Sequence, residues 1–225
     1  MLKSFDFYFN KRKITLFGNK TLLIPDFNVL VISDLHIGKA THFRKNGIAI
    51  PSISKNKDLL ALDNILSGID SSKVIFLGDL FHSEHNAEWV EMESVIKRNN
   101  QHQYILVEGN HDVLHRYEYE SASIECFENY LKIEEVIFSH DSIMEIDNEL
   151  LNISGHVHPG FLLTGKARNK VNLPCFYSDK NHLIMPAFGS LTGLKTLPFP
   201  KQGKVFPIYE GKIAVIAEQD YNSQD

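Results

Sequence analysis

The chain has 225 residues, of which 43% are hydrophobic and 23% are charged, and this composition excludes a disordered, collagenous or coiled-coil protein. Its 23 basic and 28 acidic side chains give a formal net charge of −5, so no global basic field draws the protein to nucleic acid. The two cysteines have no CxxC spacing, which favours a reducing compartment, and no apolar stretch has the length of a signal peptide or a membrane span. We therefore predict a cytoplasmic protein that does not enter a membrane. No linker or repeat divides the chain, so we expect one domain over residues 1–225.

The predicted elements begin with hairpin strands, because residues 4–25 alternate short apolar runs with turn clusters. Four β-branched apolar runs then predict strands that are buried on both faces. These runs are residues 27–33, 74–77, 104–107 and 136–139. Helical periodicity over residues 57–66 and 88–98 separates the first three runs. Strand and helix therefore alternate, which indicates a βαβ core with a parallel sheet.

The last part of the chain returns to strand patterns. The predicted strands are residues 175–177, 182–185, 205–209 and 212–216. Glu210-Gly211 separates the last two runs and predicts a tight hairpin.

Polar residues close the apolar runs, and at the carboxyl ends of parallel strands such residues meet in a ligand crevice. The candidate donors are Asp34, His36, Asp79, Asn110, His140, His156 and His158. Each motif alone fits a cap, a turn or a hydrogen-bonded core histidine, but their conjunction after separate strands favours a metal site. Carboxylate, amide and imidazole donors without thiolate suit Mn²⁺, Fe or Zn²⁺. One ion does not need seven donors, so we predict two divalent ions that share a carboxylate.

A glycine precedes three of these donors. The glycines are Gly78, Gly109 and Gly155. We expect each of them to let the backbone turn sharply as it leaves its strand, because glycine tolerates conformations that other residues avoid.

The motifs together resemble the calcineurin-like metallophosphoesterases over residues 27–161. They are Asp34-x-His36, Gly78-Asp79, Gly109-Asn110-His111-Asp112, His140 and Gly155-His156-x-His158. The resemblance implies that one metal ion is held by Asp34, His36, Asp79 and His158. It implies that the other ion is held by Asp79, Asn110, His140 and His156, with Asp79 as the bridge. It also implies an α/β fold of two mixed β-sheets packed face to face with helices outside, a four-layer α/β/β/α sandwich.

Four further segments are similar to the bacterial DNA ligase-associated metallophosphoesterases. They are residues 33–47, 78–83, 173–176 and 186–189. This similarity implies DNA processing, as in repair, and an association with a DNA ligase or helicase. We expect Mn²⁺ as the metal, with Fe, Zn²⁺ or Mg²⁺ as alternatives. His82-Ser83 stands where the related protein phosphatases carry an Asp and an Arg, which argues against a phosphoprotein substrate.

We predict that the protein is a nuclease or phosphodiesterase in which His111 donates a proton to the leaving alkoxide. Asp112 either orients His111 or serves as a helix cap or surface carboxylate. Lys39 and Arg44, on a loop after the first motif, and Arg168, after the last, are expected to bind substrate phosphate. Solvated surface cations are the alternative for these three side chains.

Two other functions remain open at this point. The same metal site would serve a small-molecule phosphodiesterase acting on cyclic nucleotides or nucleotide conjugates. A chain that keeps the fold without catalysis would be a docking module for a ligase or helicase, and degraded donors would indicate it. A homo-oligomer is left open too.

Overall fold

The computed structural model describes residues 3–45, 47, 57–164 and 170–217. Its first sheet has seven strands in chain order. They are β1 (Ser4–Phe9), β2 (Arg12–Phe17), β3 (Leu22–Ile24), β4 (Val29–Ser33), β5 (Lys73–Leu77), β6 (Gln103–Val107) and β7 (Ile124–Phe127). Strands β1 to β4 pair antiparallel, whereas β4 to β7 pair parallel. The predicted hairpins and the predicted parallel core are thus confirmed, and they form a single mixed sheet.

The second sheet runs in the order β14-β11-β12-β13-β10-β9-β8, and β15 pairs with β12 and β16. Its strands are β8 (Tyr130–Ile133), β9 (Val136–Ser139), β10 (Leu151–Ser154), β11 (Pro159–Thr164), β12 (Lys170–Asp179), β13 (His182–Ile184), β14 (Lys195–Thr196), β15 (Gly203–Tyr209) and β16 (Lys212–Ile213). Strands β9 and β10 are parallel. The hairpin predicted at Glu210-Gly211 is confirmed, since both residues have positive φ angles, 47° and 70°.

Two strands are shorter than predicted, for local reasons. A 3-10 turn over Pro25–Phe27 and the left-handed Asn28 (φ 52°) delay β4 until Val29. Strand β16 ends at Ile213, and Ile216 returns to Val205 as an isolated bridge.

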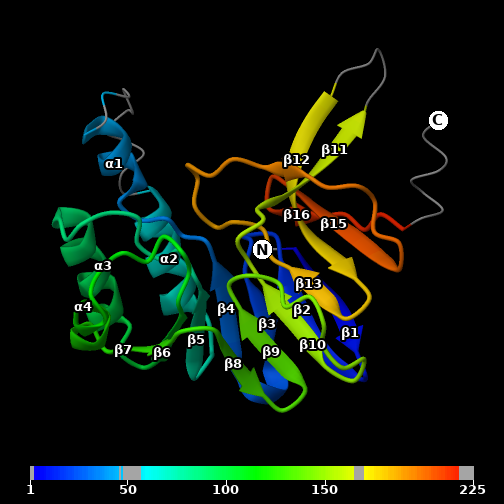
Figure 1. The fold of residues 1–225 in the computed structure, drawn as a ribbon, viewed down its shortest axis with the longest axis horizontal. Coiled ribbons are helices and arrows are strands. Elements are labelled where there is room, and N and C mark those ends of the chain that lie inside the picture. Colours follow the sequence, from blue (N-terminus) through cyan, green and yellow to red (C-terminus); the bar gives the residue numbers. More distant parts are fainter. Residues whose placement is uncertain (1–2, 46, 48–56, 165–169, 218–225) are drawn as a thin grey trace.

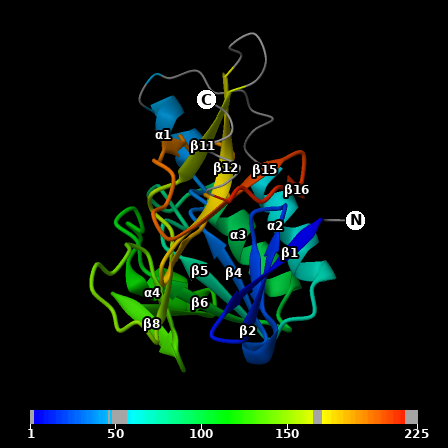
Figure 2. The same cartoon turned by 90° about the vertical axis from the view of Figure 1, so that its right-hand side faces the viewer.

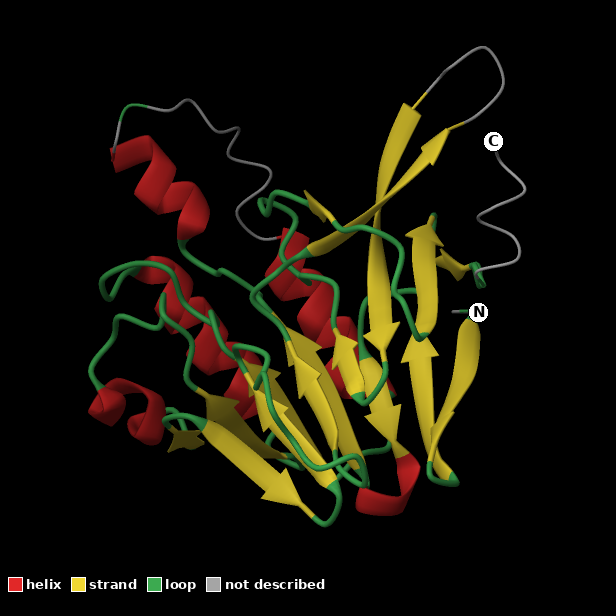
Figure 3. Ribbon diagram, turned by 45° about the vertical axis from the view of Figure 1, so that its right-hand side comes forward, coloured by secondary structure: helices red, strands yellow, loops and turns green. Residues whose placement is uncertain are grey.

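The described α-helices are α1 (Lys39–Lys45), α2 (Lys57–Gly68), α3 (Ala87–Arg98) and α4 (Arg116–Ser121). Figure 3 shows them on the side of the first sheet. Helices α2 and α3 match the predicted periodicity, and α2 buries Leu59, Leu62 and Leu66. Asn86 caps α3 by accepting the backbone N–H of Glu88 at 2.8 Å. Every helix among the described residues is too short or too polar to cross a bilayer.

The alternation of side chains along the strands builds two cores. In β4, Leu30 and Ile32 join the core beneath the helices, whereas Val29 and Val31 join the core between the sheets. The second sheet contributes side chains such as Phe138 to the same inter-sheet core. The two-sheet sandwich is confirmed, and burial of both faces explains why the core strands are continuously apolar. Both views place α1 and the β11–β12 ribbon at one end of the molecule (Figures 1 and 2).

Arg12 connects the two sheets at one point. Its guanidinium binds Glu135 (2.8 Å), Glu134 (2.6 Å) and Asp26 (2.8 Å), and it lies 4.3 Å from the centroid of the Phe27 ring. The two glutamates follow β8 in the second sheet, whereas Arg12 begins β2 in the first. The single positive charge of Arg12 therefore offsets part of the repulsion among three carboxylates.

We expect Arg12→Ala to lower the free energy of unfolding by about 2 kcal/mol, because several charge-assisted hydrogen bonds and a ring contact are lost together. Urea denaturation measures this loss. The matched control is Arg98→Ala, which removes a surface pair with Asp63 and should cost less than about 1 kcal/mol. Equal losses for the two variants would contradict a special role for Arg12.

Candidate metal centre

The predicted donors meet at the carboxyl ends of parallel strands from both sheets. Asp34 and His36 follow β4, Asp79 follows β5, and Asn110 lies in the loop after β6. From the second sheet, His140 follows β9, and the loop between β10 and β11 carries the last two histidines. Five loops from two sheets thus contribute to one site.

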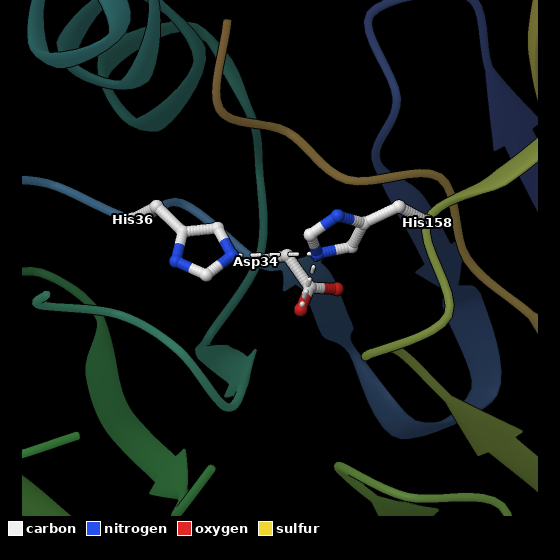
Figure 4. Close-up of side chains that lie close together, drawn as sticks. All are labelled: Asp34, His36 and His158. Atoms are coloured by element: carbon white, nitrogen blue, oxygen red, sulfur yellow. Dashed lines mark hydrogen bonds and ion pairs between the residues drawn. The ribbon is translucent and has the colours of Figure 1, made fainter. Parts of the chain in front are cut away.

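Asp34, His36 and His158 form the first cluster, in which donor atoms from the three side chains lie within 4.8 Å of one another. The Nε2 atom of His158 is 3.2 Å from Oδ1 of Asp34 and 3.3 Å from Nε2 of His36. Figure 4 shows the two rings and the carboxylate directed toward a common point. Asp34 and His36 are buried, so water competes little for this point.

Asp79, His140 and His156 form the second cluster by the same criterion. The Nε2 atom of His140 is 3.5 Å from Oδ1 of Asp79 and 3.0 Å from Nδ1 of His156. Oδ1 of Asn110 is 3.2 Å from the same His140 nitrogen, so the amide oxygen joins this cluster. His156 is exposed, and the second cluster therefore opens to solvent.

The Asp79 carboxylate lies between the two clusters. Its Oδ2 is 3.5 Å from Nε2 of His36, and its Oδ1 is 3.5 Å from Nε2 of His140. One buried carboxylate thus presents an oxygen to each cluster, as a bridging ligand must. Burial lowers the pKa of His36 to about 2, with the positive charge of Lys39 as a smaller cause. The imidazole stays neutral, and neutral imidazole is the form that binds a metal ion.

The second nitrogen of three donor histidines has its own partner. Nδ1 of His140 is 3.1 Å from the carbonyl oxygen of Leu77. Nδ1 of His36 is 3.2 Å from Nδ1 of His82, and Nε2 of His156 is 3.5 Å from Oδ1 of Asp141. Such partners fix the tautomer and the ring orientation of a metal-binding histidine. Nothing in the sequence marks His82 or Asp141 for such a role, because each is one more polar residue beside a motif.

The donors themselves adopt the unusual backbone conformation that was expected of the glycines. Their φ angles are positive at Asp34 (53°), His36 (49°), Asp79 (50°), His156 (63°) and His158 (50°). Non-glycine residues rarely adopt this region, and such strain concentrates at functional sites. Of the three glycines, Gly78 alone has a positive φ, 67°. Tight turns nevertheless begin at Gly109 and Gly155, because the N–H of Asp112 donates to the carbonyl oxygen of Gly109 at 3.2 Å and the N–H of Val157 donates to that of Gly155 at 2.7 Å.

Gly155 also permits close packing. A Cβ atom there would lie 1.9 Å from Oγ of Ser33 and 2.5 Å from Oδ2 of Asp34. At Gly78 a Cβ would lie 2.1 Å from Nδ1 of His140. The missing side chains leave room for the donors and their neighbours.

His111 lies exposed beside the clusters. Its ring centroid is 4.1 Å from that of His82 and 5.9 Å from that of His36. Its backbone N–H donates to Oδ1 of Asp79 at 2.9 Å, so the loop that carries His111 is fixed to the carboxylate between the clusters.

Asp112 joins the loops that follow β5 and β6. Its Oδ1 accepts the N–H groups of Leu80 (2.8 Å) and Phe81 (3.2 Å), and its Oδ2 accepts the N–H of Gly109 (2.8 Å). Burial raises the pKa of Asp112 to about 6, against these hydrogen bonds. These contacts support the backbone around Asp79, and we therefore assign Asp112 to loop support.

The three cations expected to bind phosphate have different surroundings. Lys39 is half-buried at the start of α1, and burial lowers its pKa against the attraction of Asp79 and Asp34. Nη2 of Arg44 is 3.8 Å from Oε1 of Glu88. Both lie on a helix, and the expectation of a loop there is wrong. Arg168 lies outside the described residues.

Lys195 is a further cation, which the sequence did not mark as a candidate. It is exposed, and its backbone N–H donates to the carbonyl oxygen of His158 at 2.9 Å. The parallel pairing of β14 with β11 brings it there, and this pairing has no sequence pattern because β14 has only two residues.

Two face-to-face sheets with paired His/Asp clusters at the ends of their strands define a metal-dependent phosphoesterase. A model of the calcineurin-like phosphoesterase family matches residues 27–190, and the chain belongs to this family. The family match and the two His/Asp clusters together show an enzyme, and the non-catalytic docking module is set aside.

One solved structure shares the fold over nearly the whole chain. The nuclease MPE of Pseudomonas putida is 24% identical, with a TM-score of 0.79 over 95% of this chain and 100% of that chain. A protein of unknown function from Aquifex aeolicus is 24% identical, with a TM-score of 0.42 over 58% of this chain and 78% of that chain. No curated protein matches the chain significantly.

Proposed function

We propose that this protein is a Mn²⁺-dependent phosphodiesterase that cleaves nucleic acid. The observation that carries the proposal is the Asp79 carboxylate between two His/Asp clusters, with the exposed His111 beside them. Mixed nitrogen and oxygen donors without thiolate fit Mn²⁺. Both cysteines are buried free thiols, which suits a cytoplasmic protein.

The candidate residues have separate proposed roles in hydrolysis. Asp34, His36 and His158 would hold one divalent ion, Asn110, His140 and His156 would hold the other, and Asp79 would contact both. Bound ions of this kind lower the pKa of water and offset negative charge on the phosphoryl oxygens. The His111 imidazole, which is exposed, donates a proton to the departing alkoxide.

Nucleic acid is the proposed substrate for two reasons. The fold likeness to a nuclease extends over nearly the whole of both chains. The charge of Lys39 interacts with Asp34 and Asp79, and the backbone of the exposed Lys195 is hydrogen-bonded to that of His158. Cations that reach past such a site bind phosphates next to the one that is cleaved. Arg168 is proposed as a further phosphate contact, and association with a DNA ligase or helicase remains part of the proposal.

A substrate panel tests this function. The Mn²⁺-loaded enzyme is given single-stranded DNA, duplex DNA, RNA, cyclic nucleotides and bis(p-nitrophenyl) phosphate. We expect turnover of the model diester and of at least one polynucleotide, with cyclic nucleotides cleaved poorly. Efficient cleavage of cyclic nucleotides alone would replace the proposal with the small-molecule phosphodiesterase.

The double variant Lys195→Ala/Arg168→Ala tests the polynucleotide contacts. Each phosphate contact to a single strand contributes about 0.7 to the slope of log affinity against log salt concentration, so the variant should bind oligonucleotide more weakly with a slope lower by about 1.4. Its turnover of bis(p-nitrophenyl) phosphate should not change, because that diester has no neighbouring phosphates. Lys97→Ala, at the end of α3 remote from Glu88, is the control. An unchanged slope would show that these cations do not bind the strand.

A further inference from the structure

Helix α1 begins three residues after the donor His36, and it stands at the end of the molecule that carries the β11–β12 ribbon (Figure 1). The backbone N–H of Lys39, its first residue, donates to the carbonyl oxygen of His36 at 3.2 Å. Seven residues are too few for a helix that is stable by itself. Contacts with the rest of the protein must therefore hold α1 in place.

Glu88 supplies such contacts from the first turn of α3. Its Oε2 accepts the backbone N–H of Gly38 at 2.9 Å, and its Oε1 accepts the hydroxyl of Thr41. Nη2 of Arg44 is 3.8 Å from Oε1 and donates to Oγ1 of Thr41 at 3.2 Å. Nε of Arg44 donates to the carbonyl oxygen of Ala40 at 3.2 Å. One carboxylate thus joins the start, the middle and the last turn of α1 to α3.

The burial of Glu88 makes this attachment specific. The residue is only 5% exposed, and a buried carboxylate without donors is strongly unfavourable. Among the residues that the structure describes, the side-chain oxygens of Glu88 have partners only in α1 or directly before it. The position of Glu88 in the first turn of α3 is also favourable for a negative charge. Displacement of α1 would therefore leave the Glu88 carboxylate unpaired. For this reason the carboxylate stabilises α1 in the position that it has here.

Lys39 is the first residue of α1, so the position of the helix sets the position of its side chain. It follows Gly38 directly, it is half-buried, and the carboxylates of Asp34 and Asp79 attract its charge. Its charge therefore acts on a carboxylate of each cluster.

We propose that Glu88 is a positioning residue for hydrolysis, which holds α1 through Gly38, Thr41 and Arg44 so that Lys39 reaches the scissile phosphate. Arg44, expected from the sequence to bind phosphate, acts through Glu88. The inference rests on the phosphodiesterase function proposed above, but it does not depend on whether the substrate is a polynucleotide.

A double-mutant cycle on bis(p-nitrophenyl) phosphate tests the proposal with the Mn²⁺-loaded enzyme. We expect Lys39→Ala to lower kcat/KM by about 100-fold, as loss of one preorganised charge contact does. Glu88→Gln and Arg44→Ala should each lower it by about 10-fold, because a displaced contact group loses part of its effect. In the Lys39→Ala background, either change should cost less than about 2-fold, since the residues act as one unit. Full additivity would overturn the proposal.

Two measurements separate positioning from a general loss of stability. Amide hydrogen exchange of residues 37–44 should accelerate in Glu88→Gln while exchange in β5 and β6 does not. Affinity for inorganic phosphate should fall in Glu88→Gln and in Lys39→Ala, with the same non-additivity. Glu91→Gln, an exposed acid on the same helix, is the control and should change neither quantity. Unchanged exchange in residues 37–44 of Glu88→Gln would contradict the proposal.

The outcomes distinguish this inference from the proposed function. If the wild-type enzyme cleaves the model diester but no polynucleotide, the substrate class is wrong and the Glu88 cycle still applies. If it cleaves no diester, the proposed function fails. The measurements of phosphate affinity and of hydrogen exchange then still test whether Glu88 positions α1.

Discussion

Asp79→Asn is expected to lower kcat for bis(p-nitrophenyl) phosphate by more than about 10³-fold, the upper range for loss of one electrostatic contact. The loss should exceed that of any other single donor, because Asp79 presents an oxygen to each cluster. An amide offers one neutral oxygen, so it cannot offset the charge of two ions at once. Metal content measured with kcat should show fewer than two ions per chain.

Asp70→Asn is the control for Asp79, since it makes the same chemical change at an exposed position beyond α2. It should keep full activity and both ions. If Asp79→Asn binds two ions and turns over at the wild-type rate, Asp79 does not join the two clusters.

His111→Ala should slow the cleavage of diesters with poor leaving groups by about 10²- to 10⁴-fold, the usual range for a general acid. A deoxyribose alkoxide needs a proton as it departs, whereas a nitrophenolate needs little help. The loss for bis(p-nitrophenyl) phosphate should therefore be much smaller. Paired measurements of kcat on an oligonucleotide and on the model diester test this difference.

Metal content is the control for His111→Ala, and it should not change, because the imidazole lies outside both clusters. Equal losses on the two substrates would indicate that His111 orients the phosphate and does not donate the proton.

The candidate metal donors were predictable because each lies within four residues of the end of an apolar strand. Parallel strands carry their carboxyl ends to one edge, so Asp34 and Asp79 had to lie close together once β4 and β5 were recognised. His140 and His156 come from the second sheet. Their places after strands also marked them as donors, but only the family resemblance implied that these strands form a second sheet, since strand order between two sheets has no local pattern.

The residues that hold α1 and the donor loops in place were not predictable, because their partners are remote in sequence. Glu88 lies fifty residues from Gly38, which it binds, and within its helix it resembles any acidic residue of a first turn. The sequence predicts a loop where α1 lies, because the seven residues of this helix show little apolar periodicity. Asp112 looked like a partner for His111 in sequence, yet its carboxylate accepts hydrogen bonds from the backbone of the β5 loop.

The most direct measurement is a crystal structure of the Mn²⁺-loaded protein with anomalous data at the manganese edge. We expect two ions per chain, one beside Asp34, His36 and His158 and the other beside Asn110, His140 and His156, with an oxygen of Asp79 bound to each. A single ion, or two ions of which only one contacts Asp79, would contradict the dinuclear centre.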